Sequence, residues 1–280
     1  MSIRLLATDL DGTLINSRWQ ISDPNRQALA AVAEQGIEIV VVTGRRLFSA
    51  LPYVEQIPCP VTLITSNGAL IRTASGEIVY RDFLPREVAL RVLQITYDYR
   101  PYSVAIFHLQ GPGQVTMQDN AVTEGPLGWY VRTNADHLRL VPDLLAAVDS
   151  DPVQVMIGGP PARIEPAETL LRTSPVESTI HLTWTKYLTR NVSILDVMNR
   201  DCCKGKALKF WAERCSIPSE EVMAVGDNFN DLEMLEFAGR PVLMGNHCKG
   251  VERPEWPITL TSDEDGLAAA IGAYILHKNI

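Results

Sequence analysis

The 280-residue sequence predicts an α/β fold in which a Rossmann-like parallel sheet is interrupted by an inserted α+β domain. Short apolar segments alternate with helical segments at both ends of the chain, which is typical of parallel strands joined by right-handed crossovers. The segment between them carries strand patterns together with many prolines and glycines, which favours an α+β arrangement. A hydrophobic content of 46% and a charged content of 21% are those of an ordinary globular protein.

The first 84 residues are predicted to begin the parallel sheet with three strands and two helices. Residues 3–10 form an apolar run that is short enough for a buried parallel strand. A helix should follow Asp23 as its N-cap residue, with Pro24 at its first position, and end at Gly36, because proline suits a first helical turn and glycine suits a helix end. The pattern continues as a strand at 37–42, a helix at 47–54 and a strand at 61–65, which stops at Ser66-Asn67-Gly68.

The rest of the chain divides into an inserted part and a return to the sheet. A hairpin arm at 77–83 and a helix at 85–97 precede strand candidates at 104–109, 153–157 and 179–184. Helices are then expected at 204–214, 232–238 and 266–276, with strands at 222–225 and 242–244. We therefore assign residues 1–84 and 190–280 to one core domain and residues 85–189 to an inserted domain.

Composition and charge exclude several classes of protein. The net charge of −8 and the lack of a basic run argue against a nucleic-acid partner, since phosphate backbones attract positive charge. No apolar run approaches the roughly 18 residues of a membrane helix, and the first residues do not form a secretory signal. The five cysteines lack Cys-x-x-Cys spacing, which argues against disulfides or zinc. We expect a cytoplasmic monomer or homodimer without a membrane partner.

Polar residues follow the ends of several predicted strands. They are Asp9 and Asp11, the segment Thr43-Gly44-Arg45, and the segment Gly226 to Asp231. Lys204-Gly205 opens a predicted helix, where backbone N–H groups favour an anion. Ligands of open α/β sheets bind outside the carboxyl ends of the strands, so these residues are candidates for one site. Clustered carboxylates with one lysine suggest a divalent-metal site that handles phosphate, since Mg²⁺ prefers oxygen ligands.

These segments resemble the four motifs of the haloacid dehalogenase (HAD) superfamily, and closely those of its Cof-type phosphatases with a type-IIB cap. The matches follow in order along the chain: Asp9-Leu10-Asp11-Gly12-Thr13-Leu14, Thr43-Gly44-Arg45, Lys204-Gly205 with Ala207-Leu208, and Gly226-Asp227-x-x-Asn230-Asp231. Three further segments resemble secondary signatures: Asn67-Gly68-Ala69, Met244-Gly245-Asn246 and Asp263-Glu264-Asp265-Gly266. The likeness covers nearly all of the core, whereas the inserted segment matches only in length and loose pattern.

The resemblance implies a role for each of these residues. Asp9 is implied to be the nucleophile and a metal ligand. Asp11 is implied to be the general acid and then the base, with its backbone carbonyl on the metal. Asp227 is implied as a direct ligand of Mg²⁺, with Asp231 beside the metal. The implied phosphate- or substrate-binding positions are Leu10, Thr43, Gly44, Arg45, Lys204 and Asn230, with Lys204 also counted as catalytic. For Arg45, a substrate contact and a structural ion pair both remain open.

The implied function is that of a Mg²⁺-dependent phosphatase that hydrolyses a small-molecule phosphate ester through an aspartyl-phosphate. Sugar phosphates or phosphorylated cofactors are the implied substrates, and the inserted domain is implied to act as a lid. A sugar phosphomutase shares the motifs and remains an alternative, which release of inorganic phosphate without isomerisation would exclude. A catalytically idle sensor of a phosphorylated metabolite is the other alternative. The complete set of Asp9, Asp11, Lys204 and Asp227 argues against it, because a binder needs no nucleophile.

Overall fold

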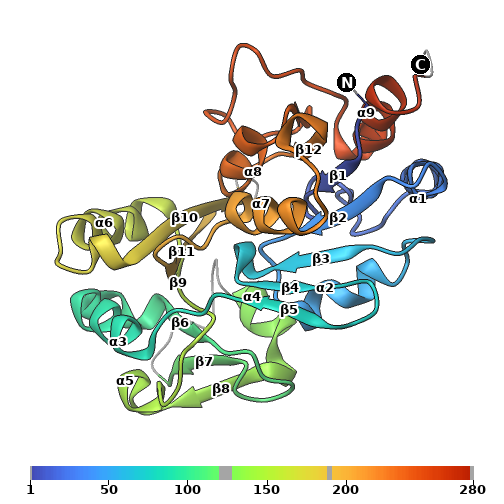
Figure 1. The fold of residues 1–280 in the computed structure, drawn as a ribbon. Coiled ribbons are helices and arrows are strands. Elements are labelled where there is room, and N and C mark those ends of the chain that lie inside the picture. The colour runs from blue at the N-terminus through green and yellow to red at the C-terminus, as the bar shows by residue number, and fades with distance from the viewer. Residues whose placement is uncertain (1, 120–127, 188–190, 278–280) are drawn as a thin grey trace. The chain divides into compact units, whose positions relative to one another are not determined.

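The structure is a computed structural model that describes residues 2–119, 128–187 and 191–277. The chain divides into two compact units, which the colours of Figure 1 distinguish by residue number. The core unit consists of Met1–Arg81 and Cys203–Ile280, and the inserted unit is Asp82–Cys202. Within the described residues, no helix is long and apolar enough to span a membrane.

The core unit is built on a mostly parallel sheet. In the described residues the strand order is β13-β12-β1-β2-β3-β4-β5. The strands from β13 to β3 run parallel, whereas β4 pairs antiparallel with β3, and β5 pairs antiparallel with β4. The strand bounds are β1 Leu5–Thr8, β2 Glu38–Val42, β3 Thr62–Thr65, β4 Leu70–Arg72, β5 Ile78–Arg81, β12 Val222–Gly226 and β13 Arg240–Leu243.

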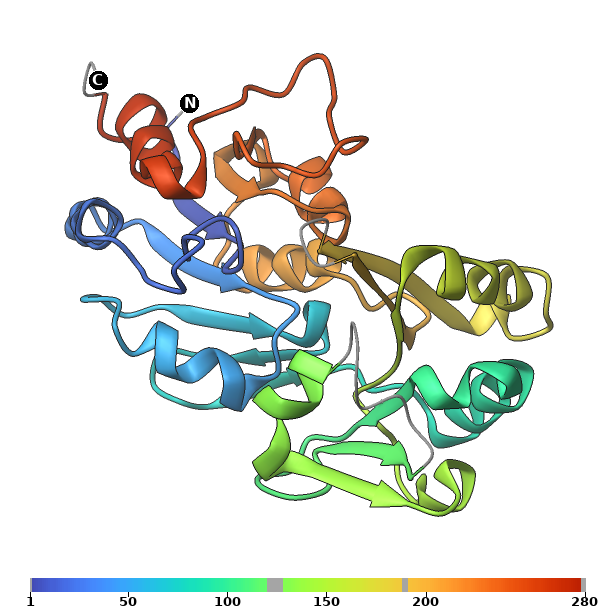
Figure 2. The same cartoon turned by 180° about the vertical axis from the view of Figure 1, so that it is seen from behind.

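Helices cover both faces of this sheet (Figures 1 and 2). Helices α7 and α8 pack against each other over one face, and α1 and α9 pack together on the other side. Their bounds, with that of α2, are α1 Asp23–Glu34, α2 Leu47–Val54, α7 Lys204–Arg214, α8 Leu232–Phe237 and α9 Gly266–Tyr274. Short 3-10 turns occupy Ser66–Gly68, Ser219–Glu221, Phe229–Asp231 and Ser262–Glu264.

The central strands are buried on both faces, which explains their apolar sequences. Leu5 and Ala7 of β1 join a cluster with Leu208 of α7 and Leu235 of α8. Leu6 lies between them in the chain, points to the opposite face and is equally buried. Each fully buried leucine stabilises the fold by about 1.5–3 kcal/mol relative to an exposed one. This packing fixes the positions of the strand ends.

The inserted unit has its own sheet and its own hydrophobic core. In the described residues the strand order is β10-β11-β9-β6-β7-β8, antiparallel except for β7 and β8. The bounds are β6 Ser103–Ile106, β7 Val115–Gln118, β8 Leu138–Val141, β9 Gln154–Gly159, β10 Ile180–Tyr187, β11 Val192–Asn199, α3 Arg86–Ile95, α4 Gly128–Thr133, α5 Leu144–Ala147 and α6 Pro161–Arg172. Leu93, Val155, Ile164 and Leu195 are buried members of its core.

The predicted fold class is confirmed, but both predicted boundaries differ from those of the structure. The sequence placed them after residues 84 and 189, whereas the units divide after Arg81 and Cys202. Residues 188–190 lie outside the described residues. Assigning residues 190–202 to the core was wrong, because β11 forms hydrogen bonds with β10 and β9 of the inserted sheet. Helix α1 also begins differently than predicted, since Ser22, not Asp23, is its N-cap residue.

Candidate active site

Four parallel strands bring their following residues to one edge of the core sheet. Asp9 follows β1, Thr43 follows β2, Asn67 lies in the turn after β3, and Asp227 follows β12. In the register of the sheet, Thr8 of β1 lies opposite Val225 of β12 and Val41 of β2. The first residues beyond these strands are therefore neighbours, although more than 200 positions separate Asp9 from Asp227 in sequence.

Helix α7 delivers Lys204 to the same edge. Cys203 caps the helix through its Sγ, which accepts a hydrogen bond from the backbone N–H of Lys206 at 3.4 Å. Gly205 allows α7 to approach α8 closely, because a Cβ at this position would lie 2.3 Å from the carbonyl oxygen of Glu233. Lys204 is thereby placed in the protein interior, with 1% of its surface exposed.

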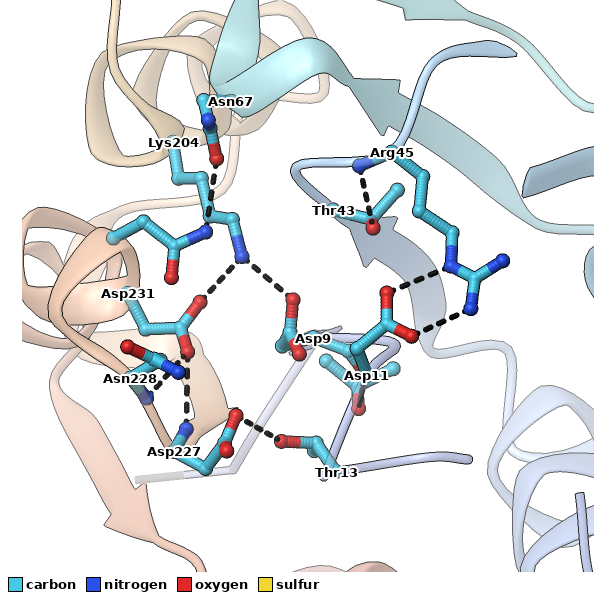
Figure 3. Close-up of polar contacts among 12 residues, drawn as sticks. Asp9, Asp11, Thr13, Thr43, Arg45, Asn67, Lys204, Asp227, Asn228 and Asp231 are labelled. Carbon is cyan, nitrogen blue, oxygen red and sulfur yellow. Dashed lines mark hydrogen bonds and ion pairs between the residues drawn. The ribbon is translucent and has the colours of Figure 1, made fainter. Parts of the chain in front are cut away.

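The ammonium group of Lys204 joins two carboxylates (Figure 3). Its Nζ donates to Oδ1 of Asp9 at 2.6 Å and to Oδ1 of Asp231 at 2.5 Å. All three side chains are buried. A charged lysine in the interior requires such partners, because removing an ammonium group from water costs several kcal/mol. The contact also fixes the direction of the Asp9 carboxylate.

Asp231 holds the neighbouring segment as well as the lysine. Its Oδ2 accepts hydrogen bonds from the backbone N–H groups of Asp227 and Asn228, both at 3.0 Å. Both carboxylate oxygens of Asp231 therefore have partners within the protein. Asp227 itself accepts a long hydrogen bond of 3.5 Å from Thr13, and its Oδ2 would lie 2.6 Å from a Cβ at Gly12. Gly12 has a φ of +81°, so this close turn requires glycine.

Burial and mutual repulsion change the pKa values of this cluster. Burial raises the pKa of Asp9 to about 7, with repulsion from Asp231 adding to the shift and Lys204 opposing it. Burial, then repulsion from Asp9 and Asp231, raises the pKa of Asp227 well above its ordinary value. Burial lowers the pKa of Lys204, but the facing carboxylates of Asp231 and Asp9 outweigh burial and raise it. The lysine therefore stays charged and cannot neutralise the cluster alone.

The donor set fits a divalent cation that prefers oxygen ligands. Asp9, Asp227 and Asp231 each offer a carboxylate oxygen, and these atoms lie within 4.8 Å of one another. With every group ionised, three carboxylates around one ammonium group leave an excess of negative charge. A bound cation would remove that excess and return the raised pKa values toward their ordinary range. Since the oxygens of Asp231 already have partners, Asp9 and Asp227 are the better placed ligands.

Replacing Asp227 with asparagine is expected to stabilise the protein in EDTA at pH 8. With raised folded-state pKa values, the folded protein binds more protons than the unfolded chain between about pH 4 and the pKa of Asp9, about 7. Stability therefore falls as the pH rises through this window. Removing one carboxylate should recover about 1–3 kcal/mol, or a few degrees in melting temperature. Thermal unfolding at pH 5 and pH 8 measures the difference.

Two comparisons complete this experiment. Asp23→Asn is the matched control, because Asp23 is an exposed aspartate of the same unit and lies outside the cluster. A divalent cation should raise the melting temperature of the parent protein and have little effect on Asp227→Asn. If the melting temperature of Asp227→Asn fell with pH as steeply as that of the parent, repulsion in the cluster would not control stability.

The carboxylate of Asp11 pairs with Arg45, whereas that of Asp9 pairs with Lys204. Its Oδ2 accepts from Nε of Arg45 at 2.7 Å, and its Oδ1 accepts from a terminal nitrogen of Arg45 at 2.6 Å (Figure 3). Burial lowers the pKa of Arg45, but the hydrogen bonds and charge of Asp11 outweigh burial and raise it. Within the described residues, the Asp11 carboxylate is not among the clustered carboxylates that could hold a metal ion. The implied metal contact through its backbone carbonyl stays a prediction.

Three of the predicted phosphate-binding residues, Thr43, Gly44 and Arg45, lie in the turn after β2, and Asn230 lies beside it. The Thr43 hydroxyl oxygen accepts from the backbone N–H of Arg45 at 3.1 Å. A Cβ on Gly44 would lie 3.0 Å from Oδ1 of Asn67 and 3.4 Å from Nδ2 of Asn230, so both amides stand close to this turn. Asn230 donates to Asn67 at 2.9 Å. Leu10 is fully buried, which leaves only its backbone for a contact with substrate.

The structure adds three residues to which sequence reasoning assigned no role. Asn67 is buried in the left-handed conformation, with a φ of +52°, and holds Asn230. Asn246 donates to the carbonyl oxygen of Gly12 at 2.8 Å, and Thr13 donates to Asp227. The signals for Asn67 and Asn246 were present, since both lie in secondary signatures. Their partners are distant in sequence, however, and no local pattern identifies them.

Comparison with known proteins gives consistent matches over nearly the whole chain. The family model of the haloacid dehalogenase-like hydrolases matches residues 6–271. Phosphatase YwpJ of Bacillus subtilis (strain 168) is 29% identical to this chain, and the match covers 95% of this chain and 98% of that protein. The 5-amino-6-(5-phospho-D-ribitylamino)uracil phosphatase YcsE of the same organism is 28% identical, with 99% of this chain and 97% of that protein covered.

Solved structures agree with the sequence relatives. A haloacid dehalogenase-like hydrolase from Bacteroides thetaiotaomicron matches with a TM-score of 0.78 at 28% identity, over 97% of this chain and 99% of that chain. Another from B. subtilis matches with a TM-score of 0.80 at 26% identity, over 96% and 99% of the two chains. The family model spans the strand ends that carry the site and the inserted unit alike. The chain therefore belongs to the haloacid dehalogenase-like hydrolases, as the resemblance of its motifs predicted.

Proposed function

We propose that this protein is a Mg²⁺-dependent phosphatase that hydrolyses small phosphate esters through a phosphoryl group carried on Asp9. The contact of Asp9 with Lys204 at 2.6 Å, beside the carboxylate of Asp227, is the observation that carries this proposal. The pairing directs one oxygen of Asp9 toward the lysine and leaves the other for attack. Relatives named as phosphatases, at 28–29% identity over nearly the full length, support the same reaction class.

Asp9 and Asp227 would hold Mg²⁺ through their carboxylates, together with the backbone carbonyl of Asp11. When bound, the ion would orient the phosphoryl group and offset negative charge as Asp9 approaches it. Asp231 would keep Lys204 and the backbone of Asp227 in place through the contacts described above. Lys204 lowers the electrostatic cost of bringing an anionic nucleophile to an anionic substrate.

The reaction would proceed in two half-reactions. Asp9 attacks phosphorus, the bond to the ester oxygen breaks, and Asp11 gives its proton to the leaving alcohol. Asp11 then removes a proton from water, which attacks the phosphorus of the aspartyl-phosphate. The bond from phosphorus to Asp9 breaks, inorganic phosphate is released and the Asp9 carboxylate is restored. The Thr43 hydroxyl and the Gly44 N–H would hold phosphoryl oxygens, with Asn230 beside them.

The inserted unit would select the leaving group, since every residue used in these steps belongs to the core unit. Its separate hydrophobic core supports an independent role of this kind. Sugar phosphates or phosphorylated cofactors are the proposed substrates. We place the enzyme in the cytoplasm, acting as a monomer or homodimer on small molecules.

Screening phosphorylated metabolites with Mg²⁺ tests the proposed function. Inorganic phosphate should be released from at least one of them, without formation of an isomeric phosphate. Isomerisation without phosphate release would identify a phosphomutase. Binding without turnover across the panel would identify a sensor and overturn the proposal.

Replacing Asp11 with asparagine should slow both half-reactions, because neither the acid nor the base remains. Each proton-transfer role is worth about 10²–10⁴-fold in rate. Turnover of an alkyl phosphate should therefore fall by at least the lower of these factors. Affinity for Mg²⁺ should change little, because the proposed contact uses the backbone carbonyl. Steady-state kinetics and titration calorimetry measure the two quantities, and a large loss of Mg²⁺ affinity would show that the side chain is a ligand.

A further inference from the structure

Arg45 holds Asp11 at two points. Its Nε and one terminal nitrogen donate to different oxygens of the same carboxylate, at 2.7 and 2.6 Å (Figure 3). A forked contact of this kind sets the plane of a carboxylate as well as its position, which a single ammonium group cannot do. The two side chains are 19% and 29% exposed, so water competes with the contact only in part.

Arg45 is itself held from several directions. Its backbone N–H donates to Thr43, and its carbonyl oxygen accepts from the backbone N–H of Ser66 at 2.8 Å. Its Cζ lies 4.4 Å from the ring centre of Tyr53 and 5.3 Å from that of Trp19. A guanidinium group is attracted to the face of an aromatic ring when it lies within about 6 Å of the ring centre. The rings and the backbone together restrict rotation of the guanidinium group.

The same contacts use three of the five N–H donors of the Arg45 guanidinium group within the protein. Nε and one terminal nitrogen donate to Asp11, while the other terminal nitrogen donates to the carbonyl oxygen of Ser49 at 3.4 Å. Asp11 is less constrained, because a carboxylate has about four lone-pair sites and Arg45 occupies two. The remaining sites of Asp11 can face the ester oxygen and then the attacking water.

We propose that Arg45 is a positioning residue that orients the Asp11 carboxylate for proton transfer, with Tyr53 and Trp19 holding its guanidinium group. This inference rests on the proposed phosphatase function and assigns Arg45 no contact with substrate. Displacing a reacting group by about 1 Å can lower the rate by about 10²-fold. Removing Arg45 should therefore damage the steps that use Asp11 and leave substrate binding nearly unchanged.

A double-mutant cycle tests the proposal with the full-length protein and Mg²⁺. The cycle compares the parent, Arg45→Met, Asp11→Asn and the double variant on glycerol 2-phosphate and on p-nitrophenyl phosphate, with enzyme in excess for the rate of the first half-reaction and with substrate in excess for kcat and KM. Arg45→Met should lower the rate with glycerol 2-phosphate by about 10–100-fold, with little change in KM. The loss on p-nitrophenyl phosphate should be smaller, because nitrophenolate leaves without a proton. In the Asp11→Asn background, Arg45→Met should have no further effect.

Two additional variants distinguish a positioning role of Arg45 from a general effect of the substitution on folding. Tyr53→Leu leaves both charged residues in place and should give a smaller loss that also disappears in the Asp11→Asn background. Arg4→Met is the matched control, because Arg4 pairs with Glu221 in the same unit and touches neither Asp11 nor Arg45. It should keep parental rates on both substrates.

Each other outcome overturns a defined part of the proposal. If Arg45→Met lowered the rate equally in the parent and in the Asp11→Asn background, Arg45 would act independently of Asp11. The inference about Arg45 would then fail, while the proposed phosphatase function would stand. A raised KM with unchanged kcat would assign Arg45 to substrate binding and also overturn it. Full activity of Asp11→Asn would overturn the acid–base assignment of the proposed function, and the inference with it.

Discussion

Replacing Asp9 with asparagine is expected to abolish turnover while leaving the fold intact. The amide has nearly the same shape, but it is a poor nucleophile and a weaker metal ligand. Loss of a covalent nucleophile costs on the order of 10⁶-fold in rate in a well-studied protease, so activity should fall below detection. Phosphate release from a good substrate, assayed with and without Mg²⁺, measures the loss.

Thermal unfolding of Asp9→Asn shows whether the loss of activity comes from the missing nucleophile or from a folding defect. Because burial raises the pKa of Asp9 to about 7, the ionised side chain destabilises the metal-free protein above that pH. Asp9→Asn should therefore unfold at the same or a higher temperature than the parent in EDTA at pH 8. Asp23→Asn, at an exposed site of the same unit, should keep both activity and stability. Retention of more than a few percent of activity by Asp9→Asn would contradict a covalent mechanism.

Replacing Lys204 with methionine is expected to affect both catalysis and stability. Lys204 is the cation that pairs with Asp9 and Asp231 in a fully buried position. Breaking a buried pair leaves an uncompensated charge and costs about 3–5 kcal/mol. The rate should fall by about 10²–10³-fold, as for loss of a group that stabilises transition-state charge. Unfolding experiments and single-turnover kinetics measure the two effects.

Lys209→Met provides the matched control for this prediction. Lys209 lies on the same helix α7, but it is 59% exposed and only loosely paired with Glu213. It should therefore retain parental stability and rate. The stability loss of Lys204→Met should be larger in EDTA at pH 8 than at pH 5, since the raised pKa of Asp9, about 7, leaves that carboxyl largely protonated at the lower pH. If Lys204→Met had the stability of the parent at both pH values, the contacts of Lys204 with Asp9 and Asp231 would contribute nothing to stability.

Local sequence patterns predict the parallel strands of the core unit and the residues at their ends, but not the antiparallel strand β4. Asp9 and Asp227 were assigned to one site because each follows a short apolar strand, and parallel strands end at the same edge. The structure brings these residues together with Lys204, as expected. Their chemical roles remain predictions that the variants above address.

Other features depend on packing that no local pattern records. Helix α6 was overlooked because Pro160 and Pro161 resemble a loop, although proline is well accommodated at a first helical position. Strand β11 was overlooked because its partners, β9 and β10, are set by the inserted sheet. For Arg45, the sequence left two readings open. The choice of Asp11 as its partner, 34 positions away, follows only from the geometry of the folded chain.

Trapping the phosphorylated enzyme tests the proposed covalent chemistry most directly. Enzyme mixed with substrate and Mg²⁺ is quenched in acid, reduced with borohydride and digested, and its peptides are analysed by mass spectrometry. An acyl phosphate on Asp9 would be reduced to homoserine, so the peptide that contains Asp9 should carry homoserine at that position only after exposure to substrate. With p-nitrophenyl phosphate, whose leaving group needs no proton, Asp11→Asn should accumulate more of it than the parent, because hydrolysis of the acyl phosphate is slowed more than its formation. An unmodified Asp9 in an enzyme that releases phosphate, or modification at another residue, would contradict nucleophilic attack by Asp9.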